Sequence, residues 1–140
     1  MKKKLTILVT VTVIVFVVFL WFLTGGGGNT SECERIVGES TVYTEKELNA
    51  AMDVVEQQFR QNFAGCYLIR LTYDEALSDL YCADWAVQYD ADQPIVLTSV
   101  FDVGPSGGDG SLNPNSTYSN WQWILTRNDQ EDWVLQTWGY

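Results

Sequence analysis

An uncharged run of 19 residues near the N-terminus constrains this chain more than any other feature. The run, "LTILVTVTVIVFVVFLWFL", covers residues 5–23 and follows three lysines at positions 2–4. As a helix with a rise of about 1.5 Å per residue it would span roughly the 30 Å hydrocarbon core of a bilayer. Because lysines favour the cytoplasmic side, residues 1–24 predict a transmembrane signal-anchor, with the C-terminal domain outside the cell membrane.

A cleaved secretory signal peptide is the alternative interpretation of this segment. Signal peptides share the basic start, but their apolar stretch is usually about 7–15 residues long and ends in small residues. Here the run is longer, and Trp21 and Phe22 near its end suit an anchor at the membrane interface. The small residues of "TGGGG" at 24–28 keep cleavage open as an alternative.

The remainder of the chain predicts a tether and one folded domain. Residues 25–41, with "GGGGNTSE", are typical of a flexible Gly-rich linker, and residues 42–140 are long enough for a single extracytoplasmic core. Beyond residue 24, five basic side chains stand against all 18 acidic ones, a net charge of −13. Such a charge repels nucleic acid, which we therefore exclude as a partner.

The numbers of cysteines and histidines limit which metal sites and catalytic groups the chain can form. The chain has three cysteines, Cys33, Cys66 and Cys82, with no C-x-x-C spacing, and it has no histidine. We therefore expect no zinc site built on Cys and His, and no nucleophile activated by histidine. Burial as small apolar side chains is the favoured role of the cysteines, and a bridge between Cys66 and Cys82 is the alternative.

The clearest element in the sequence is a helix that begins after residue 44. Thr44 and Glu47 match an S/T-x-x-E capping box, and Gly65 predicts a left-handed turn at the C-terminal end. Between them, apolar residues recur at helical spacing: Leu48, Ala51, Met52, Val55, Phe59 and Phe63. This stripe predicts a helix with one face buried in the core.

A strand and a second helix are expected next. Over about 66–73 the alternation of apolar residues predicts a strand with Tyr67, Ile69, Leu71 and Tyr73 on one face. Apolar residues spaced by four predict a helix over about 74–89.

Three further strands complete the expected fold. Residues 95–103, 117–127 and 133–140 are rich in β-branched and aromatic residues and predict a meander. Consecutive strands of this kind pair antiparallel, and the helices must cover a face of the sheet. We therefore expect an α+β domain in the order α-β-α-β-β-β, with two helices packed on a curved antiparallel sheet of about four strands.

Three segments carry a resemblance to a known group of proteins. They are "ELNAAMDVVEQQFRQNFAGCYL", "NSTYSNWQWILTR" and the C-terminal "WVLQTWGY". Over about residues 43–140 the chain resembles a family of uncharacterised small membrane-anchored or secreted proteins of Gram-positive bacteria. The element order is also similar to the cystatin-like and nuclear-transport-factor-like α+β folds. That family has no assigned activity, so the resemblance implies fold and location only.

The Gly-rich stretch "GGDGSLNPNST" at 107–117 is the candidate ligand-binding region. Connections longer than about 12 residues are uncommon without a functional reason. The candidate residues are its oxygen-bearing side chains and nearby aromatic rings: Asp102, Asp109, Asn113, Asn115, Tyr118 and Trp138. The loop lacks the EF-hand register and the chain lacks a phosphate-binding motif, so we expect neither metal nor cofactor. Because the loop is rich in small polar residues, shortening 104–116 is expected to cost little stability.

The tryptophans of the last two strands are divided between core and surface. Trp121 and Trp123 are expected to face the helices as part of the core. Trp133 and Trp138 are expected on opposite faces of the last strand, which makes at least one of them a candidate for exposure.

Three classes of function remain open: a binding module, a small enzyme, and a purely structural or inhibitory module. A pocket of tryptophans would favour a non-catalytic binding or interaction module for an unknown extracytoplasmic ligand or protein. Two converging carboxylates would favour a small enzyme acting on an extracytoplasmic or cell-wall substrate. Asp74, Glu75 and Asp102 lie at element ends, where capping and solvation are their expected roles. We therefore expect a membrane-anchored binding module and assign no catalytic residue.

Overall fold

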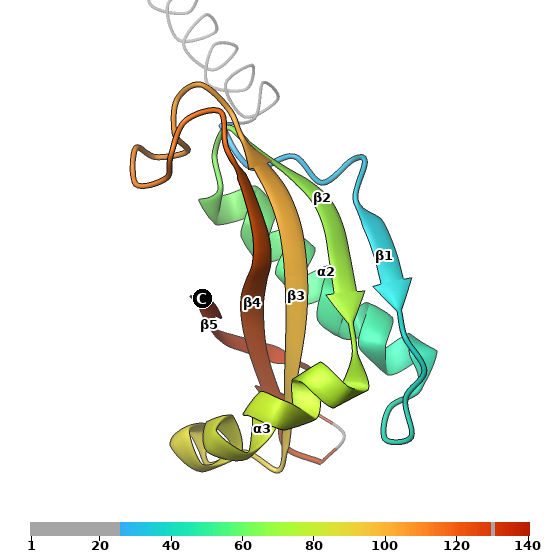
Figure 1. Cartoon of the computed structure of the whole chain (residues 1–140). Helices are drawn as coiled ribbons and strands as arrows, with labels where there is room; N and C mark the ends of the chain where they lie inside the picture. The colour runs from blue at the N-terminus through green and yellow to red at the C-terminus, as the bar shows by residue number, and fades with distance from the viewer. Residues whose placement is uncertain (1–25, 130) are drawn as a thin grey trace, which may run out of the picture.

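The part of the chain that the structure describes folds into two helices and one five-stranded sheet (Figure 1). The computed structural model describes residues 26–129 and 131–140. In chain order the elements are β1 Glu34–Val37, α2 Glu45–Asn62, β2 Cys66–Tyr73, α3 Glu75–Tyr89, β3 Gln93–Val103, β4 Thr117–Arg127 and β5 Val134–Gly139. The strands lie side by side in the order β1-β2-β3-β4-β5. The predicted α+β class is confirmed.

The sheet has one more strand than the sequence predicts, and it is mixed rather than antiparallel. β1 pairs parallel to β2, and all the other pairs are antiparallel. The observed order is therefore β-α-β-α-β-β-β. β1 lies within the segment 25–41 that was expected to be a flexible linker. Its four residues alternate between exposed and half-buried positions, so they carry no hydrophobic run that would reveal a strand.

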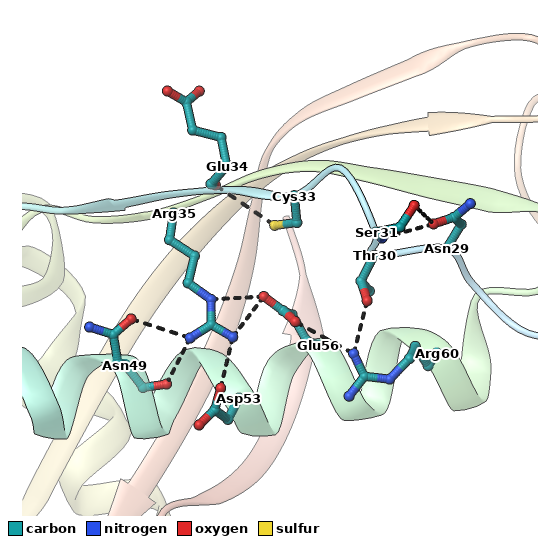
Figure 2. Close-up of polar contacts among 10 residues, drawn as sticks. All are labelled: Asn29, Thr30, Ser31, Cys33, Glu34, Arg35, Asn49, Asp53, Glu56 and Arg60. Atoms are coloured by element: carbon teal, nitrogen blue, oxygen red, sulfur yellow. Dashed lines mark hydrogen bonds and ion pairs between the residues drawn. The ribbon is translucent and has the colours of Figure 1, made fainter.

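Polar contacts with α2 hold the segment 29–37 in place (Figure 2). The Arg35 guanidinium donates to Glu56 Oε1 at 2.8 Å and to Asp53 Oδ1 at 2.7 Å. Further along α2, Arg60 donates to Thr30 Oγ1 at 2.8 Å. These bonds explain why a segment of low hydrophobicity is ordered: Arg35 of the segment pairs with two carboxylates of α2, and Arg60 of α2 binds Thr30 of the segment.

α2 covers one face of the curved sheet (Figure 1). The capping box is confirmed, because Glu47 N donates to Thr44 Oγ1 at 3.3 Å and Thr44 N donates to Glu47 Oε2 at 2.8 Å. The predicted stripe is buried along its whole length, from Leu48 to Phe63. Each such side chain contributes about 1.5–3 kcal/mol by leaving water. Gly65, two residues beyond the Phe63 cap, has the predicted left-handed conformation with φ +71°.

A bulge in β2 divides the residues that were expected to share one face. The pairing with β3 shifts between Leu68 and Arg70. Tyr67 and Ile69 consequently point away from α2 and are exposed, while Leu71 and Tyr73 are buried. An extra residue on one strand reverses the alternation beyond it, and the pattern of apolar residues does not reveal its position.

α3 crosses the opposite face of the sheet at the far end from the loop 104–116 (Figure 1). Asp74 caps the helix by accepting from Leu77 N at 2.9 Å. The pairing of β2 with β3 ends at Thr72. Beyond that point, side chains of α3 hydrogen-bond to the backbone of β3 in place of a strand. Val96 N donates to Ser78 Oγ at 3.1 Å, and Cys82 Sγ donates to the Pro94 carbonyl at 3.3 Å.

The sequence predicted a second helix packed on the sheet, but α3 is largely exposed. Ser78 is its one buried residue, whereas Leu80 and Val87 are 70% and 84% exposed. α3 is therefore held by a few contacts at one edge of the sheet and not by an apolar stripe.

The three cysteines are free, and Cys66 is buried as expected, whereas Cys33 and Cys82 are half-buried. Cys66 begins β2, and Cys82 lies in the helix that follows the end of β2. β2 is eight residues long, so Cys66 at its start lies about 23 Å from its end, where the helix that carries Cys82 begins. This separation is far beyond the Cα–Cα distance of about 4.4–6.8 Å that a disulfide allows. Burial raises the pKa of the Cys33 thiol to about 11, which keeps it protonated at neutral pH.

The predicted membrane anchor at 5–23 lies outside the described residues. Within residues 26–129 and 131–140, neither helix has the length and apolar character needed to cross a bilayer.

Candidate ligand-binding site

The candidate site is a pocket of about 240 Å³ at the end of the sheet that carries the Gly-rich loop. We call it the aromatic pocket. It is lined by the C-terminal end of α2, the loop, β4 and β5, through Asn62, Phe63, Gly108, Asp109, Ser111, Leu112, Trp121 and Trp138.

The loop 104–116 is a folded part of the domain, which the composition did not predict. Gly104 N donates to the Gly65 carbonyl at 3.0 Å, and Leu112 N donates to the Gly107 carbonyl at 3.2 Å. Gly107 has φ +71°, and a Cβ atom there would lie 2.6 Å from the Leu112 carbonyl oxygen, so only glycine fits. The Leu112 side chain packs against the core and closes one wall of the pocket.

Three aromatic rings from three elements form the apolar wall. Phe63 lies at the end of α2, with its ring centroid 6.2 Å from Trp121 and 6.1 Å from Trp138. Trp138 also lies 5.8 Å from the fully buried Trp123. Trp138 is 40% exposed, so part of this residue is open to solvent where it lines the pocket. Trp121 is only half-buried, against the expectation of a core residue.

Trp133 and Trp138 both contact α2, and the expectation of opposite faces is wrong. Trp133 Nε1 donates to the Glu47 carbonyl near the start of α2, while Trp138 packs beside Phe63 at its end. The pairing of β4 with β5 shifts between Ile124 and Leu125, so an extra residue in β5 changes the alternation.

Polar groups form the rim of the pocket. Asp109 Oδ1 accepts from Ser111 N at 3.0 Å. Hydrogen bonds from Ser111 lower the pKa of Asp109, which is therefore ionised at neutral pH. Asn62 donates to Gln58 Oε1 at 3.0 Å, which orients its amide. The rim thus combines a fixed carboxylate, an amide and a hydroxyl beside an aromatic wall.

The structure brings two of the six predicted ligand-binding residues into the pocket, Asp109 and Trp138. Tyr118 lies next to it, stacked on Phe101 with centroids 5.2 Å apart. Asn113 and Asn115 contribute to the backbone conformation of the loop. Asn115 occupies a left-handed turn with φ +54°, and Asn113 N donates to the Tyr118 hydroxyl at 3.2 Å.

Asp102 lies outside the pocket. It faces the exposed side of the sheet, where Thr117 Oγ1 donates to it across the strand pair. The two other carboxylates considered for catalysis are also structural: Asp74 caps α3, and Glu75 accepts from Ser40 and Thr41.

Sequence reasoning missed Asn62, Phe63 and Trp121 as pocket residues. Phe63 is the last residue of the apolar stripe, next to the helix end, and that position was a usable signal. Trp121 gave no such signal, because an aromatic residue in a strand is more often core.

A larger groove of about 750 Å³ lies at the opposite end of α2. Its walls include Glu47, Glu131, Asp132, Arg127 and Trp133. Hydrogen bonding to Arg127 and to Thr44 lowers the pKa of Glu47 to about 2, so this carboxylate cannot supply a proton at neutral pH. The groove surrounds the ion pair between Glu47 and Arg127.

No group of three or more His, Cys, Asp or Glu side chains in the described part of the chain is placed to hold a metal ion. Comparisons with known protein families, with curated proteins and with solved structures give no match for this chain. Function must therefore be argued from the site itself.

Proposed function

We propose that this chain is a membrane-anchored extracytoplasmic binding module, and that its aromatic pocket binds a single sugar ring. The observation that carries the proposal is that the partly exposed Trp138 and the ionised carboxylate of Asp109 line one pocket. A sugar presents C–H groups on one face and hydroxyl donors at its edge. The first can stack on an aromatic ring, and the second can donate to a carboxylate or amide oxygen.

The size of the pocket supports a ligand of one ring. Pockets for drug-sized molecules measure about 300–1,000 Å³, and this one measures about 240 Å³. Phe63, Trp121 and Trp138 are held by contacts with one another, so a ligand would meet a preformed wall and lose little affinity to reorganisation.

The composition of the rim supports binding rather than hydrolysis. Two-carboxylate hydrolysis needs an acid and a second carboxylate about 5–9.5 Å apart. Asp109 is the single carboxylate among the described residues that line the aromatic pocket. The resemblance to extracytoplasmic proteins of Gram-positive bacteria agrees with a sugar of the cell envelope as the ligand.

Titration of the detergent-solubilised full chain with glucose, N-acetylglucosamine and their β-linked disaccharides tests the proposal, with tryptophan fluorescence as the readout. We expect Trp138→Ala and Asp109→Asn each to weaken binding by about tenfold or more, the equivalent of about 1.4 kcal/mol. Trp85→Ala, a half-buried tryptophan on α3, is the matched control and should bind as the parent does. Equal loss in the control, or failure of every sugar to bind, would reject the pocket as a sugar site.

A further inference from the structure

The aromatic pocket lies at the end of the domain where the described chain begins. Gly28 N donates to the Arg60 carbonyl in the last turn of α2, at 3.1 Å. Asn29 N then donates to the Cys66 carbonyl, and Leu68 N donates to the Asn29 carbonyl, both at 2.8 Å. These bonds fix the entry of the chain beside Asn62 and Phe63, at the loop end of the sheet (Figure 1).

The chain between the predicted anchor and this entry is short. Four residues separate the apolar run, which ends at residue 23, from Gly28. Fully extended, the five steps from 23 to 28 span at most about 18 Å. The headgroup layer of one leaflet occupies roughly 5–8 Å of that distance. With the proposed anchor in the bilayer, Gly28 and the loop end beside it therefore lie within about 13 Å of the lipid surface, whereas a free linker over 25–41 would have permitted any orientation.

The surface at the loop end suits a lipid headgroup layer. Tyr67 is 50% exposed there, beside Gly104, and Trp138 is 40% exposed in the aromatic pocket. Tyrosine and tryptophan favour the membrane–water interface because they present an apolar ring and a polar tip. Asp102 and Asp109 at the same end disfavour anionic phospholipids, so the matching surface is zwitterionic or neutral.

We infer that the domain stands with its loop end docked on the lipid headgroup layer of its own membrane, and that the aromatic pocket opens to ligands carried in that layer. The inference rests on the anchor of the proposed function and holds whether or not the ligand is a sugar. α3, with Leu80 and Val87 exposed, lies at the distal end. The 11 residues of β3 separate the two ends by about 35 Å.

Energy transfer to the membrane surface tests this orientation in the full chain. The chain is reconstituted in phosphatidylcholine vesicles that contain a small fraction of headgroup-labelled acceptor lipid. A donor dye is attached by maleimide to Asn113→Cys at the loop end or to Val87→Cys on α3, both exposed positions. The unsubstituted chain, treated in the same way, corrects for reaction at the native cysteines. We expect transfer from position 113 to exceed transfer from position 87 several-fold, and equal or inverted transfer would overturn the inference.

A longer tether separates docking from simple proximity. Twenty Gly/Ser residues inserted after residue 25 would let an undocked domain move away from the bilayer. If the loop end docks, the donor at position 113 keeps its high transfer, and a fall to the level of position 87 would overturn the inference. Co-sedimentation with the vesicles is scored first. A chain that does not sediment contradicts the anchor, whereas loss of sugar binding alone contradicts only the proposed ligand.

Discussion

Arg127 joins the end of β4 to the start of α2. Its guanidinium donates to Glu47 Oε1, and Arg127 Nε donates to Gln93 Oε1 at 2.6 Å. The guanidinium carbon also lies 4.4 Å from the centroid of the Trp133 ring, which adds a cation–π contact. Because the Arg127 side chain is only 7% exposed, its charge depends on Glu47 for compensation.

Replacing Glu47 by Gln is expected to destabilise the domain by about 3 kcal/mol, because it leaves the buried Arg127 charge without its partner. Glutamine can still complete the capping box, so the loss reports the ion pair rather than the helix cap. Urea unfolding measures the change. Glu45→Gln, at an exposed position in the same turn, is the control and should cost less than about 1 kcal/mol.

The same pair has a defined pH dependence. The pKa of Glu47 is lowered to about 2 in the folded chain, from an ordinary value of 4.5. Its stabilising contribution is therefore complete above about pH 4.5 and is lost as the pH falls through about 2. The stability difference between the parent and Glu47→Gln should be constant near neutral pH and shrink between these two values. A difference that stays constant down to pH 2 would contradict the assignment.

Ser99 satisfies the indole of the buried Trp123. Trp123 Nε1 donates to Ser99 Oγ at 2.8 Å. Ser99→Ala leaves this donor unpaired in the core and is expected to cost about 1–3 kcal/mol in unfolding free energy. In a Trp123→Phe background there is no donor to satisfy, so the same substitution should cost much less. Equal costs in both backgrounds would show that the hydrogen bond contributes nothing.

At the scale of structural elements, the loop 104–116 is a folded part of the domain that contributes to its stability. Its backbone is bonded to Gly65 and to β3, since Gly104 N donates to the Gly65 carbonyl and Val103 N donates to the Ser116 carbonyl at 2.8 Å. Leu112 anchors it on the core. A loop with these contacts stabilises the domain, in contrast to what its small polar residues suggest.

Replacing 104–116 by a six-residue Gly/Ser linker is therefore expected to cost about 2–4 kcal/mol, through the lost packing of Leu112 and the lost hydrogen bonds. Trp123→Ala, which empties the middle of the core, should cost about 3–5 kcal/mol. Urea unfolding of both variants, with Leu112→Ala as the matched single change, checks the ranking. If the shortened loop unfolds with the parent, the loop is dispensable for stability, as its composition predicts.

At the scale of the whole molecule, we propose that the uncharged run and the acidic domain occupy two different solvents, the bilayer and water. The run at 5–23 is uncharged, whereas the part beyond residue 24 has a net charge of −13. High salt screens charge attraction but does not remove a transmembrane helix. The chain should therefore remain in the membrane fraction after a high-salt wash, with its C-terminus open to added protease in intact cells. Release of a mature form that begins near residue 25 would instead show a cleaved signal peptide.

What the sequence determined by itself is the set of local elements. The capping box at Thr44, the stripe from Leu48 to Phe63 and the Gly65 turn were predicted correctly, because each depends on residues within a few positions of one another. The three C-terminal strands and the α+β class follow from the same local patterns. In the candidate site, Asp109 and Trp138 were found because a long Gly-rich connection next to exposed aromatic residues is itself a local signal.

Only the tertiary structure decided how these elements meet. β1 is held by its backbone pairing with β2 and by Arg35, which binds carboxylates of α2, and no pattern within residues 34–37 could show these contacts. The bulges in β2 and β5 turned Tyr67 outward and Trp138 toward α2, because one extra residue reverses the faces of everything beyond it. The pocket joins the end of α2 to residues 108–112 and to two strands. A site of this kind depends on contacts between distant segments, and its physical cause is packing rather than any local preference of the chain.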